Sequence, residues 1–264
     1  MPGSPRVRVD TASVPAQVRA RSVRPLVGAP PLTALRRARL RTPVGAGQEA
    51  GPWPQLWLVS ADEAAADRDA PLLSAEEQTR ASDFRRASDR LLFITSHGAL
   101  RRLLGAYLDE DPAALEFVRE DCPGCGGPHG RPAVPGTPIH FSLSHTGGLA
   151  LLGFADRPVG VDIEQLPDDQ VVNDVATALH ARERAELAAL PPVARAAAFA
   201  RCWTRKEAYL KGRGDGIASE EFSTAVVGTG ASPIQLPGWT LADIPAPPGF
   251  AAACALRDSD SGSQ

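Results

Sequence analysis

The chain has 264 residues, a length that predicts one large domain or two small ones and excludes a disulfide-stabilised miniprotein. Apolar residues make up 43%, yet no run of 18 occurs, which excludes a membrane-spanning helix and predicts a soluble protein without a membrane partner. Four cysteines and the lack of a basic start followed by an apolar stretch predict a cytoplasmic, disulfide-free protein.

The net charge of −3 is unevenly distributed along the chain. Residues 1–50 carry nine arginines against Asp10 and Glu49, about +7, so the other residues carry about −10. Because this segment shows no apolar period, it predicts a disordered tail over 1–50, and a second short tail is expected over 257–264. A transit peptide, a nucleic-acid-binding arm or an overlong start at Met1, the only methionine, are the alternatives for 1–50.

The first elements after the tail are a strand over 55–60 and a helix that begins at Ser74, with Glu77 at the spacing of a capping box. Apolar residues at three- and four-residue steps then predict a long helix with one buried stripe. The stripe consists of Leu92, Leu100, Leu103, Leu104, Tyr107 and Leu108, and Arg86, Arg90, Arg101 and Arg102 are expected on the remaining surface.

Three short apolar runs follow a Gly/Pro-rich loop and predict an antiparallel meander. They are Ile139–Ser144, Leu149–Ala155 and Val159–Glu164, followed by expected helices near 171–190 and 193–211 and weak strands near 222–227, 239–243 and 250–256. The order of helices then strands occurs twice, over 55–157 and 158–256. We therefore expect an α+β fold of two similar halves packed as a pseudo-dimer.

The segment Gly160-Val-Asp-Ile-Glu164 places two acids on one face of a strand, since Asp162 and Glu164 are two residues apart. Adjacent carboxylates repel each other unless a cation lies between them, and a hard divalent ion prefers oxygen ligands. The segment predicts a metal site, with a solvated strand face as the alternative.

The segment Trp203-Thr-Arg-Lys-Glu-Ala-Tyr-Leu-Lys211 is typical of the last turns of a helix. Glu207 and Lys211 lie four residues apart on the face of Trp203, with Lys206 beside it. This face is either an ion-paired surface or a third metal carboxylate with lysines directed at phosphate oxygens.

A strand that runs into a turn, Phe141-Ser-Leu-Ser-His-Thr-Gly-Gly148, has a hydroxyl and an imidazole at its tip. Ser144 and His145 are adjacent and are not a nucleophile and its base, and the chain contains no Gly-x-Ser-x-Gly elbow of a serine hydrolase. The turn suits phosphate contacts, and a polar hairpin tip is the alternative.

These segments, in this order, resemble the 4′-phosphopantetheinyl transferases of the surfactin-synthetase-activating type over residues 72–256. The matching motifs are Gly130-Arg131-Pro132, Phe-Ser-Leu-Ser-His-Thr-Gly at 141–147, Gly-Val-Asp-Ile-Glu at 160–164 and Trp-Thr-Arg-Lys-Glu-Ala-Tyr-Leu-Lys at 203–211. The resemblance implies a magnesium-dependent holo-acyl-carrier-protein synthase with the family's double α+β fold. Such an enzyme transfers the 4′-phosphopantetheine arm of coenzyme A to a serine of an apo carrier protein and releases adenosine 3′,5′-bisphosphate.

The resemblance also implies roles for individual residues. Asp162, Glu164 and Glu207 are expected to bind Mg²⁺ and with it the pyrophosphate, Lys211 to neutralise phosphate charge, and Glu207 to deprotonate the carrier serine directly or through water. Contacts to the nucleotide's 3′-phosphate are expected from Ser144, His145 and Arg90, the adenine is expected at Gly130, Arg131 and Pro132, and Lys206 is expected as a further phosphate contact.

The insertion Cys122-Pro-Gly-Cys125-Gly-Gly-Pro-His129 departs from the simplest pattern of the family. It offers three of the four ligands that a structural zinc site requires, and no fourth ligand is evident nearby. A shaped glycine-rich loop above the nucleotide pocket is the expectation, with zinc as the alternative. Cys202 and Cys254 are expected to be buried small apolar residues.

The expected partners are coenzyme A and an apo acyl, peptidyl or polyketide carrier protein, of fatty-acid, peptide or polyketide biosynthesis, and a self-sufficient monomer is expected. A nucleic-acid-binding protein is the first alternative, but it predicts a basic body and leaves the acidic motifs unexplained. An inactive scaffold is the second, although every motif acid and lysine is present. A magnesium-dependent pyrophosphatase of coenzyme A or another nucleotide is the third.

Overall fold

The computed structural model describes residues 23–25, 54–216 and 219–259, and it divides the chain into two compact units. The first unit takes the chain up to Glu116 together with Gly148–Leu152, and the second takes Phe117–Gly147 and the chain from Gly153 onward. Residues 117–147 thus group with the C-terminal part of the chain. The division into similar halves at 55–157 and 158–256 stays a prediction.

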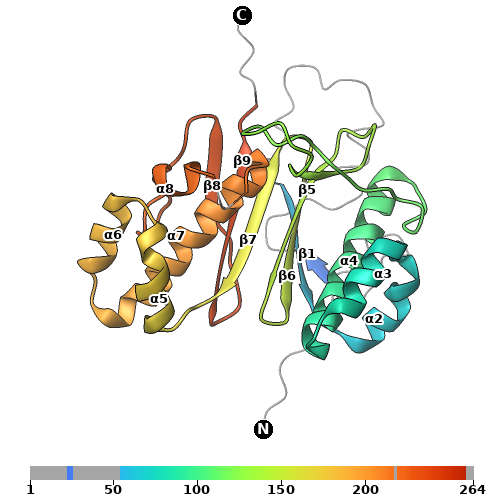
Figure 1. Cartoon of the computed structure of the whole chain (residues 1–264), viewed down its shortest axis with the longest axis horizontal. Helices are drawn as coiled ribbons and strands as arrows, with labels where there is room; N and C mark the ends of the chain where they lie inside the picture. The colour runs from blue at the N-terminus through green and yellow to red at the C-terminus, as the bar shows by residue number, and fades with distance from the viewer. Residues whose placement is uncertain (1–22, 26–53, 217–218, 260–264) are drawn as a thin grey trace, which may run out of the picture. The chain divides into compact units, whose positions relative to one another are not determined.

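The first unit combines strands with a cluster of helices (Figure 1). Its elements are β1 (Val23–Pro25), β2 (Gln55–Ser60), α2 (Glu63–Asp69), the 3₁₀ turn η3 (Ala70–Leu72), α3 (Ala75–Asp83), α4 (Ala87–Leu108) and the first part of β6 (Leu149–Ala155). The predicted strand over 55–60 is confirmed as β2. Of the disordered tail expected over 1–50, the structure describes only residues 23–25, which form β1 and pair antiparallel with β2. Residues 1–22 and 26–53 lie outside the described residues.

The capping box expected at Ser74 is present, because Ser74 Oγ accepts from Glu77 N and Glu77 Oε2 accepts from Ser74 N. Five of the six residues of the apolar stripe on α4 are buried, and Leu108 is half-buried. The expectation that Arg101 lies on the surface is wrong. Its side chain is buried, and its guanidinium donates hydrogen bonds to Glu77 Oε2, at 2.7 Å, and to the carbonyl oxygens of Pro112 and Leu115.

The Glu77 carboxylate should make the stability of the protein fall in acid. Burial opposes its ionisation, but hydrogen bonds from His97, from Ser74 N and from Arg101 lower the pKa of Glu77 to about 2. Since the folded-state pKa lies below the ordinary value of 4.5, the stabilisation is complete above pH 4.5 and disappears as the pH falls to about 2. We expect the difference in unfolding free energy between wild type and Glu77→Gln to shrink by about 3 kcal/mol across that window, as measured by urea titration. A constant difference would contradict this.

The second unit consists of a short ribbon, a sheet and the helices that cover it (Figure 1). Its elements are β3 (Val118–Arg119), β4 (Pro132–Ala133), β5 (His140–Thr146), β7 (Val159–Gln165), α5 (Asp169–Val175), η4 (Ala176–Ala178), α6 (Ala181–Ala188), α7 (Pro192–Arg213), α8 (Glu221–Thr224), β8 (Trp239–Asp243) and β9 (Phe250–Arg257). The strands β7, β9 and β8 form an antiparallel sheet in that order, and α7 packs along β7 and β9.

The predicted meander is wrong in one respect, because β7 leaves it. The sheet order β1-β2-β6-β5 contains the first two of the three predicted strands, whereas β7 pairs with β9. Even so, β7 lies against β5, where Ser142 Oγ accepts a hydrogen bond of 3.1 Å from Val161 N. The strand β7 therefore brings the acidic segment to the serine-containing strand without joining its sheet.

Three further expectations are corrected in the C-terminal part. The helix expected over 171–190 is interrupted between η4 and α6, where His180 caps α6 in a capping box with Glu183. The strand expected over 222–227 is replaced by α8. The tail expected over 257–264 is wrong for Arg257, which ends β9, and residues 260–264 lie outside the described residues. Cys202 and Cys254 are buried, as expected.

Gly160 allows β7 and α7 to approach closely. A Cβ atom at this position would lie 1.9 Å from the carbonyl oxygen of Ala208 and 2.3 Å from the amide nitrogen of Gly212, both in α7. Because residues two apart on a strand share a face, Asp162 lies on the same side of β7 as Gly160, toward α7. The glycine thus sets the distance across which the acidic strand meets the lysine-bearing helix.

None of the described helices combines the length and the apolar character needed to cross a bilayer.

Gly160→Ala should be severely destabilising, because both atoms that its methyl group would meet belong to the backbone. We expect a loss of at least about 3 kcal/mol in the free energy of unfolding, at the upper end of overpacking effects. Gly230→Ala is the matched control, since a Cβ atom there meets nothing within 4 Å. Urea denaturation of the two variants measures the difference, and equal stabilities would show that α7 yields at little cost.

Candidate functional site

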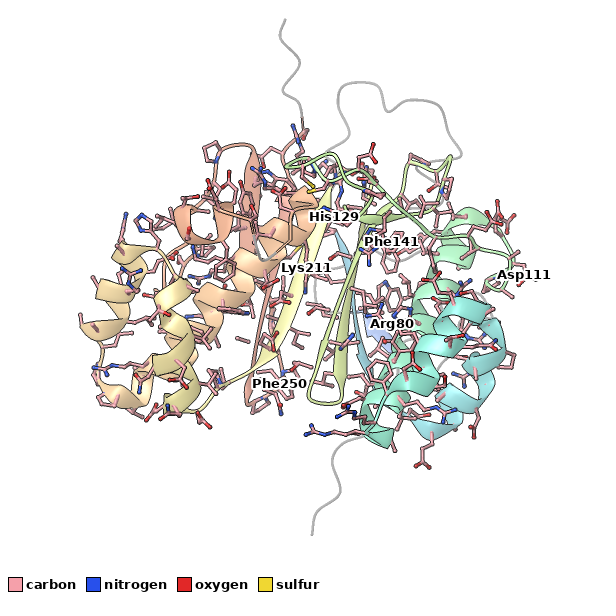
Figure 2. All side chains as sticks on the ribbon, viewed as in Figure 1. Arg80, Asp111, His129, Phe141, Lys211 and Phe250 are labelled. Atoms are coloured by element: carbon pink, nitrogen blue, oxygen red, sulfur yellow. The ribbon has the colours of Figure 1, made fainter. Side chains whose placement is uncertain are left out.

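Two elements of the second unit supply the polar groups of the site. On β7, Val161 and Ile163 are fully buried, while Asp162 and Glu164 take the opposite side of the strand. On α7, Glu207 and Lys211 lie one helical turn apart, and Figure 2 shows Lys211 beside β7. The strand and the helix thus bring together residues almost 50 positions apart in the sequence.

The Asp162 carboxylate is the centre of this arrangement. Its Oδ1 atom accepts hydrogen bonds from Lys211 Nζ at 2.6 Å and from Ser144 Oγ at 2.7 Å. Its Oδ2 atom is buried and has no hydrogen-bond partner among the described residues. One oxygen of the carboxylate is therefore oriented by protein donors, and the other is left for a ligand.

Glu207 repeats this pattern from the helix side. Its side chain is buried, and Oε1 has no hydrogen-bond partner in the described part of the chain. Burial raises the pKa of Glu207 to about 7, the negative charge of Asp162 adds to the increase and Lys211 opposes it. Burial and then Asp162 raise the pKa of Glu164 to about 6, while a hydrogen bond with Thr146 lowers it. The three carboxylates therefore repel one another with one lysine for compensation.

The donor set fits a magnesium ion. Buried carboxylate oxygens without partners are rare in proteins because each loses its hydration, and two of them occur here in one cluster. A divalent cation would give both oxygens a partner and would offset the burial and the repulsion that raise the pKa values of Glu207 and Glu164. Mg²⁺ prefers carboxylate oxygens and keeps positions for water and phosphate oxygens.

The expectation that Lys206 contacts phosphate is wrong. Its side chain is 1% exposed and its Nζ atom is used by three acceptors within the protein. These acceptors are Glu183 Oε2 at 2.8 Å, the Phe222 carbonyl oxygen at 2.9 Å and the Ala225 carbonyl oxygen. An ammonium group has three donors, so none is left for a ligand. Lys206 lies on the side of α7 that faces α6 and α8, away from Asp162.

The other residues expected to contact the nucleotide differ in their burial and in their hydrogen-bond partners. Ser144 is buried, and its hydroxyl donates to Asp162, so it orients the carboxylate cluster. His145 is exposed at the end of β5. Arg131 donates to Glu120 and to the carbonyl oxygen of Gly212, so its guanidinium ties the loop to the end of α7. Arg90 is exposed on α4, in the first unit.

For the 3′-phosphate and the adenine, the contacts expected from Ser144, His145, Arg90 and the Gly130-Arg131-Pro132 segment stay predictions. Sequence reasoning missed two residues that matter for the site. Thr146 bonds to Glu164, and Glu183 is the counter-ion of Lys206. Glu183 stands three residues after His180, and this capping-box spacing was the only available signal.

Comparisons with known proteins agree with this site. A model of the 4′-phosphopantetheinyl transferase superfamily matches residues 158–238, which contain both acidic motifs. The 4′-phosphopantetheinyl transferase HetI of Nostoc sp. is 33% identical over 199 residues, covering 72% of this chain and 81% of the relative. The chain belongs to the 4′-phosphopantetheinyl transferase family.

Two Bacillus subtilis members of this family are also similar to the chain. A 4′-phosphopantetheinyl transferase is 26% identical over 175 residues, with 65% of this chain and 74% of the relative covered. The 4′-phosphopantetheinyl transferase Sfp is 23% identical over 169 residues, with 62% and 71% covered. Membership of the phosphopantetheinyl transferase family confirms the expected α+β fold class and the expected activity, transfer of 4′-phosphopantetheine from coenzyme A to a carrier protein.

Proposed function

We propose that this phosphopantetheinyl transferase is magnesium-dependent and that Asp162, Glu164 and Glu207 hold the ion. The observation that carries the proposal is the pair of buried oxygens without partners, Asp162 Oδ2 and Glu207 Oε1, on facing elements of the described chain. When bound, Mg²⁺ would neutralise charge on the pyrophosphate of coenzyme A and polarise it for attack.

The residues of the chain supply positioning and charge. In the transfer, the carrier serine Oγ forms a bond to the β-phosphorus of the pyrophosphate, and the bond from that phosphorus to the bridging oxygen breaks, so adenosine 3′,5′-bisphosphate leaves. The serine proton passes to Glu207, directly or through one water. Lys211, held at Asp162, places a positive charge where the phosphate oxygens gain negative charge.

A magnesium titration tests the ligand assignment apart from turnover. We expect isothermal titration to detect one ion per chain in the presence of coenzyme A. Asp162→Asn and Glu164→Gln should each weaken binding at least about tenfold, because each removes one negative charge facing a dication. Glu220→Gln, at an exposed position of the same unit, is the control and should bind as wild type. Unchanged affinity in both site variants would place the ion elsewhere.

A coenzyme A pyrophosphatase would use the same carboxylates and lysine. The difference lies in the acceptor, water in place of a serine hydroxyl. Release of free phosphopantetheine with the carrier left unmodified would favour the pyrophosphatase. Acyl, peptidyl and polyketide carriers all supply the serine that the transfer requires, and comparing their rates identifies the acceptor class.

A further inference from the structure

The loop between β3 and β4 gathers three soft ligand atoms outside the carboxylate site. The ligand atoms of Cys122, Cys125 and His129 all lie within 4.8 Å of one another. Cys125 Sγ and His129 Nε2 are 2.9 Å apart, so a hydrogen bond joins the thiol and the imidazole. Two sulfurs and one imidazole nitrogen therefore face a common point.

The backbone of the loop is folded around the Cys122 sulfur. The amide groups of Gly124 and Cys125 donate to that sulfur, and the Cys125 thiol is hydrogen-bonded to it. Two backbone bonds close the turn, from Gly126 N to the Cys122 carbonyl at 2.8 Å and from Cys122 N to the Gly127 carbonyl at 2.7 Å. Gly126 has a φ of +72°, which only glycine adopts without strain. Amide donors that orient a sulfur are the support that a thiolate ligand of a metal needs.

The ribbon at the base of the loop is small. The loop leaves β3 and returns through β4, a ribbon of only two residues on each strand, and Cys125 and His129 are both exposed. So short a ribbon buries too little apolar surface to be stable alone, and small segments of this kind are usually stapled by a disulfide or a metal. All four cysteines of the chain are free thiols in the structure.

A carboxylate lies close to this cluster. A Cβ atom built at Gly124 would lie 3.8 Å from Cys122 Sγ and 3.7 Å from Asp215 Oδ1, so the sulfur and the carboxylate both lie beside Gly124. The other oxygen of Asp215 accepts from Arg213 Nε at 2.5 Å. With three protein ligands, a water molecule would be the fourth ligand of a tetrahedral zinc ion.

We propose that Cys122, Cys125 and His129 bind one Zn²⁺ ion, with water as the fourth ligand, and that the ion fixes the loop that leads into Arg131. Thiolate and imidazole ligands select zinc over magnesium, whereas the three carboxylates on β7 and α7 select magnesium, so the two sites are chemically separate. Zinc would thereby position Arg131, because His129 is followed directly by Gly130-Arg131. Arg131 in turn contacts the carbonyl oxygen of Gly212 at the end of α7.

The test uses the full chain, reduced with a phosphine, stripped of metal and reloaded with Zn²⁺ or Co²⁺. We expect one zinc per chain by elemental analysis and, with Co²⁺, the near-ultraviolet charge-transfer bands of thiolate ligation. Cys125→Ser and His129→Ala should each weaken zinc binding at least about a hundredfold, since each leaves two protein ligands. Zinc should raise the melting temperature of wild type and not that of the variants.

Two controls separate this site from others. Cys202→Ala removes a buried thiol and Asp162→Asn alters the carboxylate cluster, and both should keep one zinc per chain. Failure of reduced wild type to bind zinc, or a Co²⁺ spectrum without thiolate bands, would overturn the proposal even if the variants failed to fold. Full zinc retention by folded Cys125→Ser and His129→Ala would overturn it as well.

Discussion

Asp162→Asn and Glu207→Gln should each lower kcat for phosphopantetheine transfer by at least about a hundredfold, comparable to the loss of one electrostatic contact to a transition state. Each substitution keeps the size of the side chain and removes one negative charge. The amide that replaces the Asp162 carboxylate would still offer an oxygen to Lys211 and Ser144, but its other terminal atom becomes an NH₂ group, a donor that cannot bind a cation. The amide that replaces the Glu207 carboxylate would lack both the ligand charge and the capacity to accept the serine proton.

The controls for this prediction separate chemistry from folding. Both variants should unfold in urea at or above the wild-type midpoint, because removing one of three mutually repelling carboxylates relieves the repulsion that adds to burial in raising the pKa values of Glu164 and Glu207. Glu220→Gln should keep wild-type turnover, since this acid is exposed and outside the cluster. Turnover within a few-fold of wild type in both Asp162→Asn and Glu207→Gln would remove these residues from the active site.

Lys206→Met should destabilise the protein by about 3–5 kcal/mol, because it leaves the Glu183 carboxylate buried without its cation. Glu183 is fully buried and also accepts hydrogen bonds from Val227 N at 2.8 Å and Gly228 N at 3.2 Å. The pair therefore connects α6, α7 and the segment after α8 into one core. Urea denaturation at neutral pH measures the loss.

Lys211→Met is the matched control, since Lys211 is also on α7 but its side chain is 31% exposed. We expect the two variants to lose different properties. Lys206→Met should lose mainly stability, and Lys211→Met should lose mainly turnover. Adding Glu183→Gln to Lys206→Met should recover part of the stability, because glutamine keeps the acceptor without a charge. A stable Lys206→Met protein with weakened coenzyme A binding would restore the original expectation that this lysine contacts phosphate.

The local order of the chain could be predicted where spacing determines structure. The alternation in Gly160–Glu164 correctly predicted a strand with both acids on one side, and the four-residue spacing of Glu207 and Lys211 correctly predicted their shared helix face. The spacing of Ser74 and Glu77 correctly predicted a capping box at the start of α3, because both of its hydrogen bonds form within the first turn of the helix. These patterns depend on neighbouring residues alone.

Long-range partners could not be predicted in this way. Lys206 and Lys211 are both basic and close to Glu207 on the same helix, yet one is paired with Glu183 in the core and the other with Asp162. Lys206 and Lys211 are separated by little more than one turn of α7. Only the packing of α6 and α8 against α7 decides which of the two lysines is buried. The strand expected over 222–227 became α8 for a similar reason, since Phe222 packs edge-on against Trp203 of α7. Arg101 likewise became buried through partners 11 and 14 residues away.

Mass spectrometry of apo carrier proteins shows directly whether this site carries out a magnesium-dependent transfer of phosphopantetheine. Acyl, peptidyl and polyketide carriers are each incubated with the protein, coenzyme A and Mg²⁺, with and without EDTA. We expect that at least one carrier gains the mass of one phosphopantetheinyl group on its serine, and that EDTA abolishes the gain until Mg²⁺ is restored. Modification that persists in EDTA, or cleavage of coenzyme A with every carrier left unmodified, would contradict it.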